Sequence, residues 1–514
     1  MNPVKTTGKT VLAVFLSVCC LIALLGGCGR AKNPPERSAA ETTTASPAET
    51  TETNYTSDLP KNLEFNEEFS LVARNHAGVA DEFYSVGITE SLIESAVYRR
   101  CSAVETRLGV SLNVTLVEDE KTYSHSTIVR KLENEMAVGE SSYDLVAVPM
   151  YTTISSQVKG TFLNLYDLNY LDLTKYYWAQ NANSALSIGK AQFIATGAAT
   201  LSIYRFMYIT VINSDFLTVS RFPENYIYHA VKDGNWTLDL QAEIAKDLYM
   251  DRNGNSERDE GDAYGFVSGA RTSVDTYWIS TDSTVVTKDP ENYYVFSAST
   301  DRISGVVDKI LRLYYDYEGS YIVPYANDNT DNAQILNVFN RGNTAMATMM
   351  VNAIESGVVG NAYFLYEIAP IPKYEAAQDG YFTHVQDQVT AMAVPSNVAP
   401  ARRDMVGAVM ESLAEEGYRY LYAAYFEKIL PYRYLQSQES VEMLQLIYES
   451  VGFGIVEQEM AGGQITTMLR EIISAEVNMV SSKMESVTRN APDMIREVND
   501  AYRELYLQTN PAGE

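Results

Sequence analysis

A twelve-residue stretch, 251–262, carries oxygen-bearing side chains at the spacing of a calcium-binding loop. Positions 1, 3, 5, 9 and 12 supply carboxylates or amides and position 7 supplies a backbone carbonyl, which are ligands that a hard cation prefers. Ser256 stands where a glycine usually makes the sharp turn, and Asp262 is shorter than the usual bidentate glutamate. The pattern indicates either a structural calcium site or a solvated acidic turn. Its ligands would be Asp251, Asn253, Asn255, Glu257, Asp259 and Asp262.

Aromatic side chains form a second group that could bind a ligand, because their ring faces can stack on the apolar face of a sugar. The chain has 37 tyrosines and three tryptophans. Tyr277 and Trp278 follow Arg271 and Asp275 in a stretch that we expect to be a loop. This combination favours a ligand platform, with ordinary packing as the alternative for each ring.

Signatures of the common enzyme classes do not occur in the sequence. The four histidines lack the spacing of a metal site, and there is no nucleophile elbow, phosphate-binding glycine loop or CxxC pair. The 66 acidic residues guarantee chance carboxylate pairs, so a glycoside hydrolase stays open as an alternative. The formal charge of −27 argues against a nucleic-acid partner. The sequence therefore favours a protein that is not an enzyme.

Alternating strands and helices in the first part of the folded chain would position a binding site. Residues 69–73 and the nearly continuous apolar run 143–148 predict strands, and residues 110–116 alternate apolar and polar side chains as a strand does. Amphipathic stretches at 92–108 and 128–136 predict the intervening helices. This order predicts an α/β lobe with a parallel sheet, whose ligands lie at the carboxyl ends of the strands. Asn75 and His76 follow the first strand, and Tyr151 follows the third, so we expect them at the site.

The N-terminal residues predict export and lipid attachment. Two lysines precede an uncharged apolar run of about 15 residues, shorter than the roughly 20 that span a bilayer core. The run ends in Leu25-Gly26-Gly27-Cys28, which resembles the lipobox of bacterial lipoproteins. That resemblance implies a signal peptide at 1–27, a lipid on Cys28 and anchoring on the extracellular face of the cell membrane. A plain secretory signal or an uncleaved membrane helix is the alternative.

Composition divides the rest of the chain. Residues 28–62 are rich in Thr, Ala, Pro, Glu and Ser, which predicts a disordered tether. The remainder is too long for one ordinary core, so two lobes are expected. We place a first part of lobe 1 at 63–205, lobe 2 at 206–380, and a return to lobe 1 with C-terminal helices at 381–514. Cys101 is the one cysteine of this body, which excludes an internal disulfide framework.

Several ordered stretches resemble the extracellular solute-binding proteins of ABC importers, in particular the carbohydrate subgroup of family 1. One departure is Gln436-Ser437-Gln438, which stands where relatives often carry an Arg-Asp pair before a late helix. The stretches that carry the resemblance are Tyr143-Asp144-Leu145-Val146, Gly160-Thr161-Phe162-Leu163-Asn164-Leu165, Gly234-Asn235-Trp236-Thr237-Leu238-Asp239, Phe339-Asn340-Arg341-Gly342-Asn343-Thr344-Ala345-Met346, Ala369-Pro370-Ile371-Pro372-Lys373-Tyr374 and Glu439-Ser440-Val441-Glu442-Met443-Leu444.

The resemblance implies a two-lobed periplasmic-binding-protein-like α/β fold of type II with a hinge between the lobes. It implies a monomer that binds a mono- or oligosaccharide in the cleft, uses no cofactor and delivers the sugar to ABC permease subunits. It also places Asn352, Gln386 and Asp387 along the cleft. A lipoprotein that senses or scaffolds without a permease is the alternative from another functional class.

Overall fold

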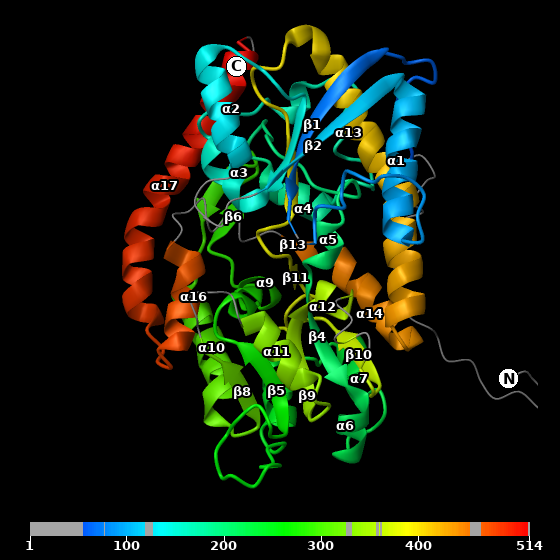
Figure 1. Ribbon diagram of the computed structural model, residues 1–514. Coiled ribbons are helices and arrows are strands. Elements are labelled where there is room, and N and C mark those ends of the chain that lie inside the picture. The colour runs from blue at the N-terminus through cyan, green and yellow to red at the C-terminus, as the bar shows by residue number, and fades with distance from the viewer. Residues whose placement is uncertain are drawn as a thin grey trace, which may run out of the picture. The chain divides into compact units, whose positions relative to one another are not determined.

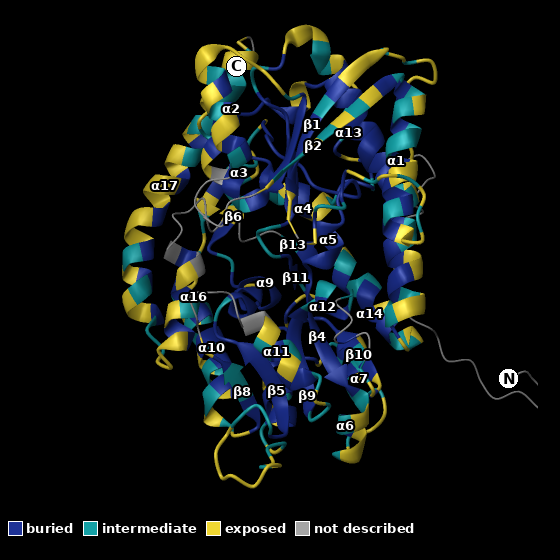
Figure 2. Cartoon of the chain, in the orientation of Figure 1, coloured by how far each residue is buried: buried dark blue, intermediate teal, exposed yellow. Residues whose placement is uncertain are grey.

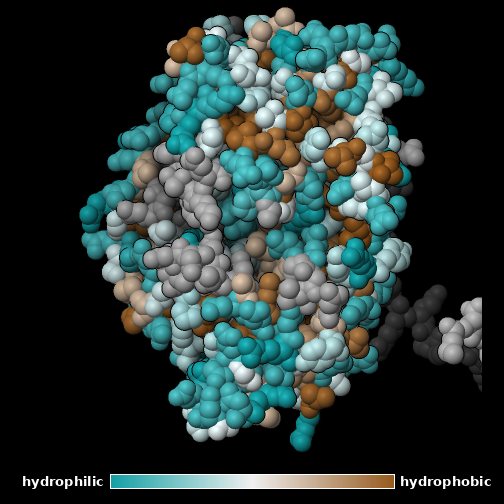
Figure 3. All heavy atoms as spheres, viewed as in Figure 1, coloured by the Kyte–Doolittle hydropathy of each residue, from teal (hydrophilic) through white to brown (hydrophobic). Residues whose placement is uncertain are grey.

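The computed structural model describes residues 55–76, 78–118, 127–324, 331–355, 359, 362–452 and 464–511. Residues 50–514 form one compact unit. The expected signal peptide, Cys28 and residues 28–54 of the expected tether lie outside the described residues. Residues 55–62 were expected to belong to the tether, but they pack on the body instead, because Leu59 is buried and Asp58 pairs with Lys175 at 2.8 Å. Within the described ranges, no helix is both long enough and apolar enough to cross a membrane. Hydrophilic residues cover most of the face seen in Figure 3, with smaller apolar patches between them.

A four-stranded sheet with the order β12-β3-β1-β2 occupies the upper half of the molecule in Figure 1. Its parallel strands are β1 (Glu67–Asn75), β2 (Val110–Glu118) and β3 (Leu145–Pro149), and β12 (Thr390–Ala393) pairs antiparallel with β3. The connecting helices are α1 (Leu92–Leu108) and α2 (Thr127–Val138). The predicted strand and helix order of the first part of the chain is confirmed.

Local sequence explains why α1 begins and ends where it does. The Ser91 hydroxyl accepts a hydrogen bond from the backbone N–H of Glu94 at 3.2 Å, which is an N-cap. Gly109 ends the helix with φ of 62°, a conformation that costs little only for glycine. The chain then enters β2 directly, so the cap sets the start of the strand.

A mixed five-stranded sheet with the order β10-β4-β9-β5-β8 occupies the lower half. The central strands β5 and β9 are parallel, whereas β4 runs antiparallel to β9 and to β10. The strands are β4 (Tyr208–Asn213), β5 (Tyr264–Gly269), β8 (Ser320–Val323), β9 (Thr344–Met350) and β10 (Tyr366–Ala369). The helices that follow the chain through this half are α6 (Ser214–Val219), α7 (Tyr226–Lys232), α8 (Leu238–Ala245), α9 (Thr276–Ser280), α10 (Thr300–Leu311), α11 (Asp331–Phe339) and α12 (Asn352–Glu355).

Two described segments, which lie side by side, connect the two sheets. Residues 206–208 lead into β4 and residues 385–390 lead into β12, and Met207 and Val385 pair in an antiparallel bridge. Beside them, β11 (Thr383–His384) pairs with β13 (Val451–Gly452). We call this region the junction: residues 206–208 and 383–390 with the strand ends that adjoin them.

The C-terminal part is helical, as expected. Helix α13 (Arg403–Gly417) continues into the π-helical stretches η6 (Tyr418–Tyr422) and η7 (Tyr425–Tyr434). The 30-residue α17 runs along one side past both sheets in Figure 1. The remaining elements of this part are α14 (Gln438–Glu449), α16 (Gln464–Ser474) and α17 (Val480–Thr509); short elements elsewhere are α3 (Met150–Gln157), α4 (Gln180–Leu186), α5 (Ser202–Arg205), β6 (Val286–Lys288), β7 (Tyr294–Phe296), η2 (Leu165–Asp167), η3 (Thr272–Asp275), η4 (Arg312–Asp316) and η5 (Pro400–Arg402).

Buried side chains gather on both faces of the upper sheet (Figure 2). Because side chains alternate along a strand, Leu71 and Ala73 of β1 join one apolar cluster and Val72 joins the other. The first cluster includes Val406 and Met410 of α13, and the second extends into the five-stranded sheet. The two sheets therefore share a continuous core.

Candidate ligand-binding site

The residues predicted at the carboxyl ends of β1 and β3 lie at that edge of the upper sheet. Asn75 is the last residue of β1, is exposed, and donates a hydrogen bond to Glu118 at 3.4 Å. His76 follows it and is also exposed, with its carbonyl accepting from Ala80 at 2.9 Å. Tyr151 lies in the first turn of α3 and is half-buried. Each residue is at the strand end where the sequence placed it.

The junction brings Tyr151 together with Asp387, although 236 positions separate them. The backbone N–H of Tyr151 donates to the carbonyl oxygen of Asp387 at 3.2 Å. Gln386 donates through its backbone N–H to the carbonyl of Phe206 at 3.1 Å, and the side chain of Arg74 donates to the carbonyl of Gln388 at 2.9 Å. These bonds fix the turn that carries Gln386 and Asp387, whose side chains are half-exposed.

Asn352 reaches the same junction from the five-stranded sheet. It is the first residue of α12, and the residue before it, Val351, donates to the carbonyl of Met207 at 3.0 Å. Of the eight residues predicted to bind ligand, Tyr151, Asn352, Gln386 and Asp387 therefore adjoin the two connecting segments. They come from three separate parts of the chain, namely α3, α12 and the segment that leads into β12.

A charged pair that the sequence did not single out borders the junction. Arg470 of α16 makes a forked contact with the buried carboxylate of Asp275, with Nε at 2.8 Å from Oδ1. Burial lowers the pKa of Arg470, but the charges of Asp275 and Asp387 outweigh it and raise that pKa above its ordinary value. Arg470 thus remains cationic and electrostatically linked to predicted ligand residue Asp387. No periodicity or motif distinguishes Arg470 in the sequence, so only the fold reveals it.

His384 supplies an uncharged ring at the junction. Its ring stacks on Tyr208 with centroids 5.4 Å apart and an interplanar angle of 13°. Burial, with a further contribution from nearby Arg470, lowers the pKa of His384 to about 3. The histidine is therefore neutral at physiological pH and contributes its stacked ring, not a positive charge, to the junction.

A second ion cluster holds α5 and α12 together next to the junction. Arg205 contacts Asp81 at 2.7 Å and Glu355 at 3.3 Å, and Tyr425 donates to the same Glu355 carboxylate. Burial raises the pKa of Glu355, an effect that Arg205 and Tyr425 oppose. Because these charges satisfy one another, we assign the cluster to positioning the junction and not to ligand binding.

Tyr277 and Trp278 do not form the exposed loop that the sequence suggested. They lie on the short helix α9, and their exposed fractions are 0% and 2%. Tyr277 packs edge-on against Tyr314 with ring centroids 6.2 Å apart. The expected loop is wrong because tertiary packing buries this aromatic pair, and in this conformation neither ring presents a face to a ligand.

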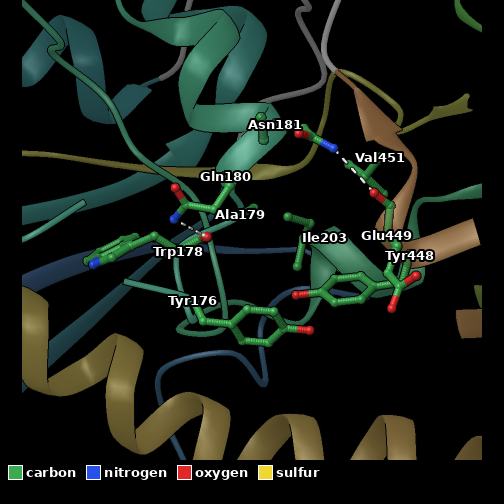
Figure 4. Close-up of a pocket in the computed structure, with 10 residues that line it drawn as sticks. Tyr176, Trp178, Ala179, Gln180, Asn181, Ile203, Tyr448, Glu449 and Val451 are labelled. Atoms are coloured by element: carbon green, nitrogen blue, oxygen red, sulfur yellow. Dashed lines mark hydrogen bonds between the residues drawn. The ribbon is translucent and has the colours of Figure 1, made fainter. Parts of the chain in front are cut away.

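A cavity of about 140 Å³ lies beside the junction (Figure 4). The rings of Tyr176 and Tyr448 point into it, and the Asn181 side chain donates across its edge to the carbonyl of Glu449 at 3.2 Å. Trp178 borders it and donates through Nε1 to Glu411 at 3.0 Å. None of the predicted ligand residues lines this cavity. Its volume suits a molecule near the size of benzene, which is smaller than a sugar.

The acidic loop 251–262 folds around its own side chains. Asp251 accepts hydrogen bonds from the backbone N–H groups of Gly254 at 2.7 Å and Ser256 at 2.9 Å. Ser256 has φ of 61°, so it adopts the left-handed turn that glycine usually provides at this position. The backbone hydrogen bond from Gly261 is the main reason why the pKa of Asp259 is below its ordinary value, and side-chain hydrogen bonds from Asn255 and Asn253 lower it further. Across the described residues, no three His, Cys, Asp or Glu side chains converge as a ready metal site.

Sequence comparison identifies no related protein: no family model matches the chain, and no curated protein matches it.

Structure comparison does find similar proteins. A cyclo/maltodextrin-binding protein solved with maltotetraose is 12% identical, with 83% of this chain and 96% of that chain covered and a TM-score of 0.51. The GacH receptor of Streptomyces glaucescens, solved unliganded and with acarbose, is 13% identical, with 86% and 99% covered and a TM-score of 0.50. The chain therefore has the α/β fold of the periplasmic-binding-protein-like solute-binding proteins, as its sequence predicted.

Proposed function

We propose that the protein is the substrate-binding lipoprotein of an ABC importer and that it captures a mono- or oligosaccharide at the junction. The observation that carries the proposal is the convergence of Tyr151, Asn352, Gln386 and Asp387 at the junction of this fold. One aromatic ring can stack on a sugar face, while carboxylate and amide groups pair with its hydroxyls. Closure of the two halves about residues 206–208 and 385–390 would then bury the ligand.

Attachment and delivery complete the proposal. A lipid on Cys28 would hold the protein at the extracellular face of the membrane, and residues 28–54 would give it reach toward two permease subunits. Substituting Cys28→Ser should release the protein into the medium. Retention of that variant in the membrane fraction would argue for an uncleaved helix instead.

A thermal-shift screen over monosaccharides, oligosaccharides, amino acids and peptides tests the ligand class. A ligand at 100 times its Kd stabilises the folded state by about 2.7 kcal/mol, which is easily seen as a raised Tm. We expect a saccharide to raise the Tm, and we expect Asp387→Ala and Tyr151→Ala to reduce that rise. Asp493→Ala, an exposed aspartate of α17, is the control that should respond like the unaltered protein. A response to peptides alone would remove the saccharide assignment.

Two alternatives give different results in direct assays. A surface glycoside hydrolase would release shorter products from an oligosaccharide, whereas a binding protein would leave it intact. A sensor or scaffold would bind ligand in the same way but would lack neighbouring genes for two multi-spanning permease subunits. Intact oligosaccharide together with such genes is the outcome that our proposal requires.

We propose a structural calcium ion at residues 251–262 as a second, separate function. The left-handed turn at Ser256 supports it, because it removes one of the two departures from a calcium loop. The shorter Asp262 remains, and it already accepts from the backbone N–H of Arg252 at 3.2 Å. A chelator should lower the Tm of the unaltered protein and have no effect on Asp251→Ala. An unchanged Tm with chelator would refute the site.

A further inference from the structure

A groove of about 620 Å³ lies between the π-helical stretch η7 and helix α14. Pockets that hold small organic ligands measure about 300–1,000 Å³. The groove has an apolar floor that includes the buried side chains of Phe426, Leu435 and Leu444. Helix α14 packs against β10, the edge strand of the five-stranded sheet, so the groove is separate from the residues assigned to the junction.

Three polar side chains along this groove are each held at one end by a hydrogen bond. Gln436 accepts through Oε1 from the backbone N–H of Tyr366 at 3.3 Å. Gln445 donates through Nε2 to Glu449 at 2.6 Å, and Glu442 accepts through Oε2 from the Tyr228 hydroxyl at 2.7 Å. Within the described part of the chain, no hydrogen bond occupies their other ends. The groove is thus bordered by one amide donor, from Gln436, and two acceptors, from Gln445 and Glu442. Because these side chains are already held in place, they would lose little further conformational entropy when a ligand binds.

The helical wall of the groove departs from the regular α-helix. Residues 425–434 are π-helical, with hydrogen bonds five residues apart, as in the 2.7 Å bond from the N–H of Leu435 to the carbonyl of Leu430. Pro431 lies within this stretch and has no N–H, so it cannot donate to the carbonyl of Phe426, five residues before it. Both residues line the groove. Such π-helical turns occur frequently at functional sites.

We propose that the groove between η7 and α14 binds a saccharide, as a site distinct from the junction. Hydroxyls of a sugar both donate and accept, which matches the mixed amide and carboxylate groups of Gln436, Gln445 and Glu442. The apolar floor matches the C–H face of a pyranose ring. Part of this border is formed by Gln436-Ser437-Gln438, the sequence departure noted above, in which Gln438 is exposed. The groove site goes beyond the proposed function and stands whether or not the junction takes a ligand.

Calorimetric titration with maltotetraose and with cellotetraose tests the groove on the Asp387→Ala protein, in which the junction is impaired. We expect one of the two tetrasaccharides to bind, and we expect the double substitution Gln438→Ala/Gln445→Ala to weaken that binding at least tenfold. Gln508→Ala makes the same chemical change on exposed α17 and should leave the affinity unchanged. Amide hydrogen exchange over residues 426–446 should slow when the tetrasaccharide is present.

The outcomes separate the two sites. Absence of binding to both tetrasaccharides in the Asp387→Ala protein overturns the groove site, as does binding that the double substitution leaves unchanged. Protection over 383–390 without protection over 426–446 overturns it too, while supporting the junction. Binding that depends on Gln438 and Gln445 but not on Asp387 supports the groove and removes the junction proposal.

Discussion

Glu411 shows how a single buried carboxylate can make stability depend on pH. It is 1% exposed on α13 and accepts hydrogen bonds from Tyr177, from Trp178 at 3.0 Å and from the N–H of Asp172 at 3.2 Å. Burial raises its pKa to about 7 from an ordinary 4.5, although Tyr177 and Trp178 act in the opposite direction. The folded protein therefore binds this proton more tightly than the unfolded chain.

The sign of the pH effect follows from that difference. The stabilisation is fully present below about pH 4.5 and is lost as the pH rises through about 7, and the loss amounts to about 3 kcal/mol. We expect Glu411→Gln to flatten this part of the pH dependence. Urea unfolding of both proteins at pH 5 and pH 7.5 measures it. The same change in unfolding free energy for both proteins would contradict the shift.

At the scale of elements, α13 packs unusually close to the chain around η2. A methyl group on Gly407 would lie 2.0 Å from the carbonyl oxygen of Asn169, which is backbone and cannot move aside. Glycine to alanine ordinarily stabilises a helix interior by up to about 1 kcal/mol. Here we expect Gly407→Ala to destabilise instead, by about 1–3 kcal/mol, because the helix must shift.

The matched control is Gly305→Ala in α10, where the added methyl would meet the terminal hydroxyl of Tyr374. The end of a side chain can shift more readily than backbone, so the substitution should cost less. Thermal unfolding of the two variants measures the difference. An equal or higher Tm for Gly407→Ala would show that α13 can move away from Asn169.

Local sequence patterns predicted the elements better than the site. The alternation in residues 110–116 and the cap formed by Ser91 and Gly109 act over a few residues, so they specify β2 and α1 directly. Arg470 and Asp387 are brought together only by the fold, and no local pattern links them. Burial of Tyr277 likewise depends on Tyr314, which is 37 positions away in the sequence, and this explains why the expected loop was wrong.

At the scale of the whole molecule, α17 and the residues just before it contact helices of both the upper and the lower half. Asn478 just before it donates to Asp308 of α10 at 2.7 Å, while Tyr502 near its end donates to Gln157 of α3 at 2.6 Å. Between these contacts, Asn499 exchanges two hydrogen bonds with the backbone of Tyr294, at 3.1 and 2.9 Å. The helix therefore fastens the upper and lower halves along one side.

Removing the Asn499 side chain should weaken that fastening. Asn499→Ala leaves the backbone N–H and carbonyl of Tyr294 buried without these partners. Each unpaired group costs at most about 1–3 kcal/mol of unfolding free energy. We expect a lower midpoint in urea unfolding. Asn490→Ala, on the exposed face of the same helix, controls for helix propensity and should leave the midpoint nearly unchanged. Equal midpoints for the two variants would contradict the role of Asn499.

Pro492 gives α17 a mechanical consequence. It lies inside the helix between the attachment at Asn478 and the attachments at Asn499 and Tyr502. A regular helix resists stretching along its axis, but a proline removes a hydrogen bond and lets the axis bend at that point. If the two halves close as proposed, we expect α17 to bend near Pro492. Such bending would store elastic energy as the halves approach and release it as they separate.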